Sequence, residues 1–498
     1  MYRAWLTLLL VGIAGAQDRA AVATAAAHLL DAEALAGARV GIVVYDLDSE
    51  ESLYTHDADR GFMTASNMKL ISSAVALQQL GPDFRFTTRL VAKSDNNPSV
   101  LGNLWLVGDG DPSLGGRPIE DSMAPLRAMA RKLHEAGVRR IDGDVFGDAS
   151  CQPVEPYGRG WQWDYLETYY AVPMSGLCFG ENLANVFVSG SGQVGTPPEL
   201  RIEPVEDAVS VVHDLRCLAK GSKTALSFGR APHGKEVQLR GAIAADAAEQ
   251  RLRVAVTDPP QFAAQAMVAA LREQGIEVAG QARTGRAPAG AVTVAEHVSA
   301  PLAEIVDPLL RDSVNVYAEQ VWWRAARTAG AVDSAAVERH GKQVLRELGV
   351  PTDGMLLADG SGLSRRNLVQ PRQIAALLEA IWRGPLLASV WPALPVAGVD
   401  GTLRRRFPPS SPCHGRLRAK TGFISYVVCL SGYLPRPEPA PPLVFVVMIN
   451  NFTCPTKAAQ DAIDAFCNAL AGAVGWAEPP QPGREVVPAT GTGRRDRE

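Results

Sequence analysis

The sequence predicts an α/β protein in which an antiparallel sheet is flanked by helices and interrupted by a large β-rich insertion. Three observations predict this architecture. Strand-like and helical patterns open the chain over residues 19–85. Short strands separated by Asn, Pro, Gly and Asp turns then fill residues 86–295. Helices return from residue 296, and three sequential strands and a last helix follow them.

The same observations divide the 498 residues into more than one domain, because this length exceeds one ordinary domain. We expect residues 19–85 and 296–477 to form one discontinuous domain. Residues 86–295 are expected to form one or two inserted domains. Residues 478–498 are rich in Pro and Gly, a composition that predicts a disordered tail.

Periodicity places the first elements of the discontinuous domain. An Ala-rich amphipathic pattern predicts a helix over residues 19–33. Two strand-like segments joined by an acidic turn predict a pair of strands over residues 39–57. A further amphipathic pattern predicts a helix over residues 66–80. Within the insertion, the one clear helical pattern covers residues 262–275.

The second half of the discontinuous domain is predicted to contain helices and then a sheet. The helical patterns cover residues 302–327, 335–349, 371–383 and 458–474. Three apolar, strand-like segments precede the last helix, at residues 416–423, 427–435 and 442–452. The turns between them predict three neighbouring antiparallel strands.

The N-terminus has the pattern of a secretory signal peptide over residues 1–16. Arg3 supplies a positive charge, an apolar run follows from Trp5 to Ile13, and small residues surround Gly15. The alternative is a permanent membrane anchor, but the apolar run is shorter than the ~20 residues that span a bilayer. We therefore expect an exported protein with at most peripheral membrane association.

Charge and cysteine content narrow the class of protein further. A net charge of −4 gives no basis for nucleic-acid binding, which usually requires a strongly basic domain. The seven cysteines form neither a CxxC motif nor a cluster that suggests zinc. An exported chain can form disulfides, and the spacing leaves the pairing open. We expect a mixture of buried thiols and one or two disulfides.

Ser66 and Lys69 lie one turn apart at the start of the predicted helix, so their side chains share a face. A serine hydroxyl becomes a nucleophile when a neighbouring base takes its proton. Lysine can be that base if burial lowers the pKa of its amine. Free N–H groups at a helix start also stabilise an oxyanion. The alternative is a solvated surface pair, because SxxK occurs by chance about once or twice in a chain of this length.

Two further motifs carry compatible chemistry. Ser313 and Asn315 precede a helical pattern, so a hydroxyl can relay a proton while an amide holds a substrate carbonyl. The alternative is an ordinary helix-capping serine. Lys420, Thr421 and Gly422 lie on a predicted strand, where they offer a charge, a hydroxyl for a carboxylate and room for close approach. The alternative is an edge strand with a protective lysine.

In this order the three motifs match the SxxK, SxN and KTG set of the serine penicillin-recognising enzymes. The chain resembles the class C low-molecular-mass penicillin-binding proteins, which are D-alanyl-D-alanine carboxypeptidase/endopeptidases. The large insertion between the first two motifs is typical of that subfamily. The resemblance covers residues 20–475 and includes the phrases LWLVGDGDPSL, GDVFGDAS, YYAVPMSGLCFGENLANVFV, LADGSGLSRRN and PVAGVDGTLRRRF. It implies a transpeptidase/β-lactamase-like fold and a periplasmic location.

The resemblance also implies a role for each motif residue. Ser66 would attack the penultimate D-Ala carbonyl of a peptidoglycan stem peptide, with Lys69 as the general base. Ser313, with Lys420 nearby, would return a proton to the leaving amine. Asn315 would hold the substrate amide, and Thr421 with Lys420 would bind its terminal carboxylate. β-Lactam antibiotics would act as inhibitors that acylate the same serine, and no metal or cofactor is implied.

Other positions carry less specific expectations. Phe423 stands where relatives usually have Thr or Ser after KTG. Its backbone N–H can still contribute to an oxyanion hole. The side-chain hydroxyl of Thr or Ser is absent, so one expected contact to the substrate carboxylate is lost. Asp148 and Arg365 match family positions that approach the side-chain end of the stem peptide. Their alternative role is structural ion pairing. Asp359, Asp400 and Thr402 are expected to be structural.

Two other functions remain compatible with parts of this pattern. A β-lactamase would share the chemistry and release its acyl group quickly, but the length and the insertion disfavour it. A non-catalytic cell-wall-binding scaffold could keep the fold. The presence of both lysines disfavours that function, because a scaffold has no chemical need of them.

Overall fold

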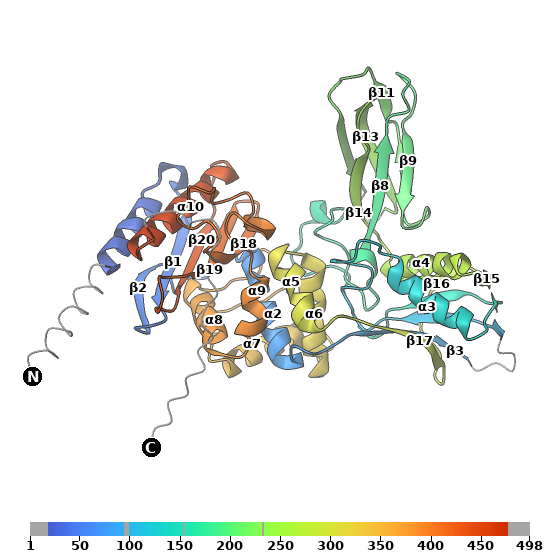
Figure 1. Ribbon diagram of the computed structural model, residues 1–498, viewed down its shortest axis with the longest axis horizontal. Coiled ribbons are helices and arrows are strands. Elements are labelled where there is room, and N and C mark those ends of the chain that lie inside the picture. The colour runs from blue at the N-terminus through green and yellow to red at the C-terminus, as the bar shows by residue number, and fades with distance from the viewer. Residues whose placement is uncertain (1–17, 94–98, 153–154, 232–233, 477–498) are drawn as a thin grey trace, which may run out of the picture.

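The computed structural model describes residues 18–93, 99–152, 155–231 and 234–476. The predicted signal peptide and tail lie outside these residues. The chain forms two large parts (Figure 1). One part holds a sheet and most of the helices, and its segments come from both ends of the sequence. The other part is built from the intervening residues, and some of its strands project as an upright β structure.

The main sheet has five antiparallel strands in the order β18-β19-β20-β1-β2. The strands are β1 (Arg39–Asp46), β2 (Glu51–His56), β18 (Arg418–Ile424), β19 (Val427–Leu434) and β20 (Leu443–Asn450). This arrangement confirms the strand pair near the N-terminus and the three sequential strands near the C-terminus. The order leaves β18, which carries the KTG motif, at one edge of the sheet.

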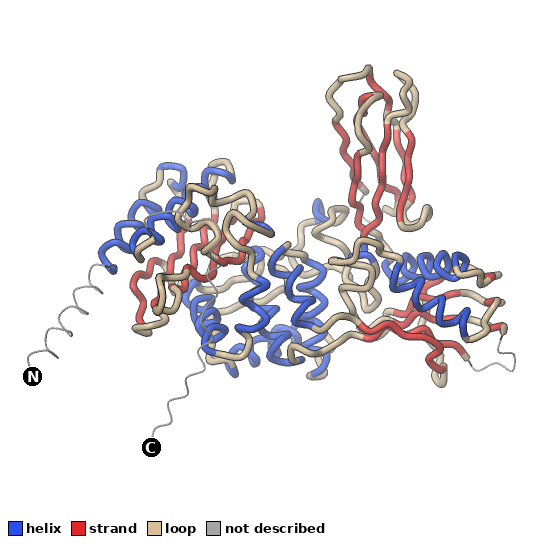
Figure 2. The backbone as a smooth tube through the Cα atoms, in the orientation of Figure 1, coloured by secondary structure: helices blue, strands red, loops and turns tan. Residues whose placement is uncertain are grey.

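Helices cover both faces of the main sheet, as Figure 2 shows, so its central strands are apolar on both sides. In β20, Phe445 and Val447 pack with α10 (Thr456–Ala473) and a helix over residues 18–30. Their neighbours Val446 and Met448 point to the opposite face and join the core under the other helices. Successive side chains of a strand alternate between faces, so a strand buried on both faces needs a continuous apolar run.

Among the described residues, seven helical segments gather on the side of the second face. They are α2 (Met68–Leu80), α5 (Leu302–Arg311), α6 (Asn315–Thr328), α7 (Ser334–Glu347), α8 (Pro371–Arg383), α9 (Leu387–Ala393) and the short η2 (Ala65–Asn67). Of these, η2 and α8 pack directly on the sheet. The helical pattern over residues 302–327 is two helices rather than one continuous helix. The chain leaves the helix at Asp312, and Ser313 has a φ of 62°, which no α-helix accommodates.

In its described residues, the inserted part contains four sheets and two longer helices. Its strands are β3 (Thr87–Ala92), β4 (Val100–Leu101), β5 (Leu104–Val107), β6 (Arg140–Ile141), β7 (Val145–Asp148), β8 (Leu183–Ser189), β9 (Glu199–Glu203), β10 (Ser210–His213), β11 (Arg216–Leu218), β12 (Ala225–Gly229), β13 (Glu236–Ala244), β14 (Gln250–Ala255), β15 (Glu277–Val278), β16 (Ala282–Thr284) and β17 (Val292–Val298). Its longer helices are α3 (Ala124–Glu135) and α4 (Pro259–Glu273). Short 3-10 turns complete the chain: η1 (Glu33–Leu35), η3 (Trp163–Tyr165), η4 (Gly180–Asn182) and η5 (Gly401–Leu403).

The insertion is more helical than its sequence predicts, because α3 accompanies the expected α4. Leu126, Met129, Ala130 and Leu133 follow a helical spacing and are buried in the core of the inserted part. Charged residues alternate with them, which hides the pattern among the surrounding strands. The β-rich character is confirmed, and the strand that closes the insertion, β17, pairs with its first strand, β3.

All seven cysteines are free, so the expectation of one or two disulfides is wrong. Five of them are buried in the three hydrophobic cores and behave as small apolar side chains. Cys413 and Cys467 come nearest to pairing. The Cys413 thiol instead donates to the Cys467 carbonyl at 3.2 Å.

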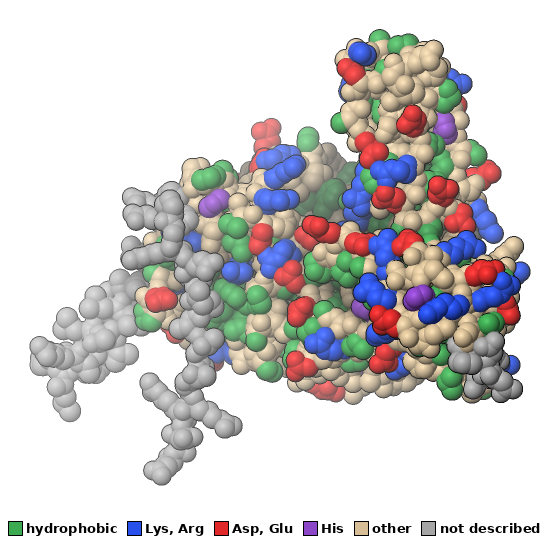
Figure 3. All heavy atoms as spheres, turned by 45° about the vertical axis from the view of Figure 1, so that its right-hand side comes forward, with side chains coloured by type: hydrophobic (Ala, Val, Ile, Leu, Met, Phe, Trp, Pro, Cys, Tyr) green, Lys and Arg blue, Asp and Glu red, His purple; other side chains and the backbone are tan. Residues whose placement is uncertain are grey.

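Figure 3 shows acidic and basic side chains mixed over the face where the upright β structure meets its base. In the part of the chain that is described, no single helix is long and apolar enough to cross a membrane. Helices α8 and α9 reach that length and composition only together, across a bend of 114°.

Candidate active site

Ser66 lies in the 3-10 turn η2, directly before α2. The buried side chain of Asn67 attaches this turn to the main sheet. Its amide nitrogen donates to the Lys420 carbonyl at 2.7 Å, and its amide oxygen accepts from the Ser431 hydroxyl at 2.8 Å. The predicted nucleophile is therefore held against the edge strand β18 that carries the KTG motif.

Lys69 is completely buried and makes three hydrogen bonds. Its Nζ donates to Ser66 Oγ at 3.0 Å, to Asn315 Oδ1 at 2.6 Å and to the Ser361 carbonyl at 2.8 Å. Burial lowers the pKa of Lys69 to about 7, although the nearby carboxylates of Asp359 and Glu319 act in the opposite direction. A large fraction of this amine is neutral near pH 7, as a general base must be.

Ser313 and Lys420 form a second hydroxyl–amine pair. The left-handed backbone of Ser313 lies in the break between α5 and α6. Lys420 Nζ donates to Ser313 Oγ at 2.9 Å and to the Thr421 carbonyl at 3.1 Å. Burial, and then the charge of Lys69, hold the pKa of Lys420 well below its usual value. The charge of Lys69 therefore favours the neutral form of Lys420.

Asn315 connects the two parts of the molecule at this site. Its Oδ1 accepts from Lys69, while its Nδ2 donates to the Tyr170 carbonyl at 2.7 Å. Tyr170 belongs to the inserted part, in the segment that precedes β8. The side-chain amide is thus oriented by one contact from each part.

Gly422 and its neighbours form the opposite wall. A Cβ added to Gly422 would lie 2.9 Å from the Thr64 carbonyl, so only glycine fits this close approach between β18 and the Ser66 turn. The Thr421 hydroxyl donates to the Thr402 hydroxyl at 2.8 Å. The Phe423 side chain is 53% exposed and offers no hydrogen bond.

A loop over residues 359–364 contacts Lys69 through the Ser361 carbonyl, which accepts a hydrogen bond from Lys69 Nζ. The buried carboxylate of Asp359 accepts from the backbone N–H groups of Gly362 at 2.8 Å and Ser364 at 2.6 Å. It also accepts from Trp161 Nε1 at 2.8 Å. Asp359 therefore holds the loop together, which agrees with its expected structural role, and the loop presents the Ser361 carbonyl to Lys69.

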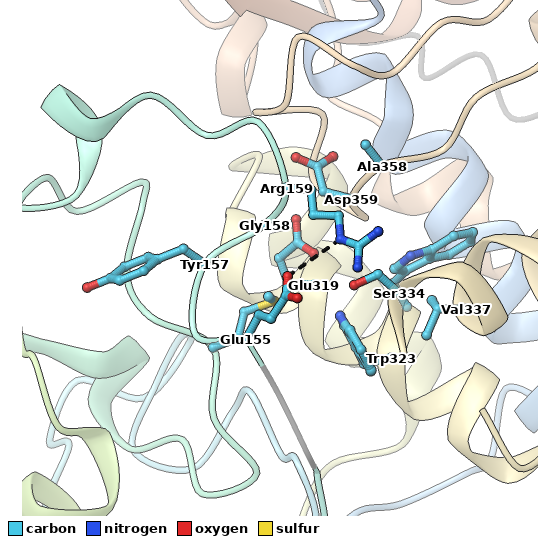
Figure 4. A pocket seen from close by; sticks show the side chains of 12 residues that line it. Glu155, Tyr157, Gly158, Arg159, Glu319, Trp323, Ser334, Val337, Ala358 and Asp359 are labelled. Atoms are coloured by element: carbon cyan, nitrogen blue, oxygen red, sulfur yellow. Dashed lines mark ion pairs between the residues drawn. The ribbon is translucent and has the colours of Figure 1, made fainter. Parts of the chain in front are cut away.

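Glu319 is a buried carboxylate that the sequence analysis missed. It accepts from the N–H of Gly360 at 3.0 Å and of Ser361 at 2.8 Å. Burial, and then the charge of Asp359, raise the pKa of Glu319 to about 8. Figure 4 shows Glu319 and Asp359 beside the same small cavity. Its position four residues after Asn315 on α6 is the signal that could have found it, since such residues share a helix face.

Gly362 allows this loop to approach the nucleophile turn. Its φ is 85°, and a Cβ there would lie 1.7 Å from the Ala65 carbonyl. We expect Gly362→Ala to lower the free energy of unfolding by about 2–4 kcal/mol, from strain and overlap together. We expect it to slow acylation about tenfold, because the Ser361 carbonyl would move. Denaturant unfolding and the rate of penicillin acylation measure the two effects.

Gly330→Ala is the matched control for this prediction. Gly330 has a φ of 82° and open space where the Cβ would lie. This variant should cost only the conformational penalty of about 1–2 kcal/mol and acylate normally. Equal losses of stability in the two variants would contradict the inference that a Cβ at position 362 overlaps the Ala65 carbonyl.

Arg365 and Asp148 have different surroundings. Arg365 lies beside the end of β18, where its guanidinium donates to Gln162 Oε1 at 3.3 Å and to the Ser425 carbonyl at 2.5 Å. Asp148 is buried, and its two oxygens accept from the N–H of Ser150 at 2.8 Å and of Ala287 at 2.7 Å. No ion pair joins Asp148 and Arg365 among the described residues, so the geometry does not bring these two side chains together.

A serine hydrogen-bonded to a buried lysine and a second serine–lysine pair therefore meet at the edge of an antiparallel sheet covered by helices. This combination defines the class of serine penicillin-recognising peptidases. The chain belongs to the D-Ala-D-Ala carboxypeptidase 3 (S13) family, whose model matches residues 21–471. It is accordingly a serine-type D-Ala-D-Ala carboxypeptidase.

The similar proteins agree with this assignment. The D-alanyl-D-alanine carboxypeptidase of Actinomadura sp. (strain R39) is 35% identical over 457 residues, which are 87% of this chain and 82% of that protein. Penicillin binding protein 4 (dacB) from Haemophilus influenzae has a crystal structure that covers 91% of this chain and 98% of its own, with a TM-score of 0.78 at 23% identity. Its complex with a β-lactam has the same coverage, with a TM-score of 0.72 at 22% identity. These structures establish the shared fold and confirm the predicted fold class.

Proposed function

We propose that this enzyme hydrolyses the terminal D-Ala–D-Ala bond of peptidoglycan stem peptides through an acyl-enzyme on Ser66. The observation that carries the proposal is the 3.0 Å hydrogen bond between Ser66 Oγ and the fully buried Nζ of Lys69. An amine with a pKa of about 7 can accept the serine proton at neutral pH.

In the acylation step, Ser66 Oγ bonds to the carbonyl carbon of the penultimate D-Ala as its proton passes to Lys69. The backbone N–H groups of Ser66 and Phe423 face the oxyanion that forms. The C–N bond then breaks, and the leaving amine takes a proton from Ser313 Oγ. The proton that Lys69 accepted from Ser66 replaces it by way of Lys420, so that Ser313 and both lysines end the step in the protonation states in which they began it. The 2.9 Å contact between Lys420 Nζ and Ser313 Oγ supports this relay.

Other residues hold the substrate in this proposal. Beyond its contacts to Tyr170 and Lys69, Asn315 keeps a second Nδ2 hydrogen and a second Oδ1 lone pair, and we assign these to the peptide amide. Lys420 and Thr421 bind the terminal carboxylate. Water then attacks the acyl-enzyme and restores Ser66. A D-Ala–diaminopimelate cross-link presents the same bond, so the proposal includes endopeptidase activity, with Arg365 at the side-chain end of the stem peptide.

Asp148 is not included among the substrate contacts. Its carboxylate oxygens already accept from two backbone N–H groups. The N-terminal pattern supports export to the periplasm, where the substrate lies. β-Lactams imitate D-Ala-D-Ala and are proposed to acylate Ser66 stably, as the complex of the H. influenzae protein with a β-lactam suggests.

Intact-mass spectrometry after incubation with penicillin tests the proposal. We expect the mature wild-type protein to gain the mass of one penicillin and the Ser66→Ala variant to gain none. The same two proteins are then incubated with a stem peptide ending in D-Ala-D-Ala and with a cross-linked muropeptide, and D-Ala release and cross-link cleavage are followed.

Each other outcome has a defined meaning. No adduct, with penicillin surviving in solution and no D-Ala released, would overturn the acyl-enzyme mechanism and favour a wall-binding scaffold. Rapid loss of penicillin without an adduct would favour a β-lactamase. Release of D-Ala without cleavage of the muropeptide would restrict the enzyme to carboxypeptidase activity.

A further inference from the structure

A large groove in the inserted part carries no role in the reaction proposed above. Its volume is 810 Å³, within the range of small-molecule sites. One wall is the segment around Trp161 and Trp163, and the other includes Arg230, at the end of β12, and Gln261, in α4. The groove therefore lies where the upright β structure of Figure 1 meets the base of the inserted part.

The first wall is an aromatic surface. Trp163 is 69% exposed, which is unusual for the largest apolar side chain in a folded protein. Tyr157 and Trp161 line the same groove, with ring centroids 6.4 Å apart. In Figure 4, Tyr157 points away from the small cavity beside Glu319. Exposed aromatic faces with negative π density stack on C–H groups, such as those on one face of a pyranose ring.

The second wall offers hydrogen-bonding groups. Arg230 donates to the Ala255 carbonyl at 2.8 Å, but its Nε is buried and has no partner among the described residues. Glu167 and Gln261 add a carboxylate and an amide to the lining. An aromatic surface together with a few polar groups in one groove is suited to a saccharide, which has apolar ring faces and hydroxyl or acetamido edges.

The same segment connects the groove to the active site. Gln162, between the two tryptophans, accepts from Arg365 at 3.3 Å. The Nε1 of Trp161 donates to Asp359 at 2.8 Å, in the loop that supports Lys69. Farther along the segment, the Tyr170 carbonyl orients Asn315. A molecule that extends beyond Arg365 would therefore meet the aromatic wall next.

We propose that this groove binds the glycan strand of peptidoglycan to which the stem peptide is attached, with Trp163 stacking on a sugar ring. The inference rests on the proposed function for the identity of the peptide. It adds that the enzyme recognises N-acetylated sugars as well as the peptide, at a site separate from Ser66.

The test compares two substrates that share one peptide ending in D-Ala-D-Ala, one free and one attached to the N-acetylglucosaminyl–N-acetylmuramyl disaccharide. We expect wild-type enzyme to have a kcat/KM about tenfold higher for the disaccharide form, mainly through a lower KM. Trp163→Ala should remove this preference and leave the free peptide unaffected. Trp163→Phe, which retains an aromatic face, should keep most of it.

A second measurement separates this inference from the proposed function. Binding of a peptide-free disaccharide is measured by calorimetry on Ser66→Ala and on the Ser66→Ala/Trp163→Ala double variant. Binding to the first and not to the second would support the groove even if Ser66 failed to acylate. Equal kcat/KM for the two substrates, or an equal loss for both in Trp163→Ala, would overturn the proposal. A loss that depended on peptide length and not on sugar would assign the groove to peptide.

Discussion

Lys69→Met is expected to slow penicillin acylation about 10²- to 10⁴-fold while Ser66 remains in place. Methionine fills a similar volume but can neither accept the Ser66 proton nor donate to Asn315 Oδ1 and the Ser361 carbonyl. The variant therefore loses the base and leaves two acceptors without their donor. The time course of adduct formation, measured by intact mass, gives the rate.

The pH dependence adds a second readout to this prediction. Only the neutral amine can accept a proton, so wild-type acylation should rise with pH through the pKa of Lys69, about 7. The residual rate of Lys69→Met should lack that rise. Lys457→Met, which replaces an exposed lysine on α10, should acylate like wild type. A Lys69→Met variant that acylates at the wild-type rate would exclude Lys69 as the base.

Glu319→Gln is expected to slow acylation roughly 5- to 100-fold, although Glu319 touches neither Ser66 nor Lys69. Its two oxygens accept from the N–H groups of Gly360 and Ser361. A glutamine has only one acceptor oxygen, and its NH₂ would face an N–H donor. One buried hydrogen bond is then lost, at a cost of about 1–3 kcal/mol. The Ser361 carbonyl, which positions Lys69, would be less well held.

The sign of the pH shift distinguishes this role from a general loss of stability. Glu319 gains its negative charge as the pH rises toward about 8, and where it is charged it favours the protonated form of Lys69. Removing it should therefore move the upper part of the rise in acylation rate to lower pH in Glu319→Gln and leave the most acidic part in place. The profile should also become simpler, because Glu319, with a pKa of about 8, no longer titrates with Lys69. A lower rate with an unchanged profile would limit Glu319 to a structural role.

Some structural elements can be predicted from the sequence and others cannot. Continuous apolar runs predict β19 and β20 well, because a strand buried on both faces needs such a run. The break between α5 and α6 is not visible in the helical pattern, because it depends on the left-handed backbone at one residue, Ser313. That all seven cysteines are free depends on where the fold places each thiol and which way it points, as for Cys413, whose thiol faces the Cys467 carbonyl, and spacing along the chain cannot reveal this.

Periodicity, composition and motif order were enough to predict the fold class, the family resemblance and the three motifs. Short spacings within one helix turn or one strand place Ser66 near Lys69 and Lys420 beside Thr421, whatever the rest of the chain does. The tertiary structure alone decided which residues meet across the site. It paired Lys420 with Ser313 and placed the Tyr170 carbonyl on Asn315.

The acid–base properties of the site also depend on the tertiary structure. Lys69 has a pKa near 7 because it is fully buried, and Glu319 has a raised pKa for the same reason. Burial is produced by packing between segments far apart in the chain, and neither composition nor local spacing encodes it. The sequence therefore identified the reacting groups, and only the tertiary structure decided how they are held and in which protonation states.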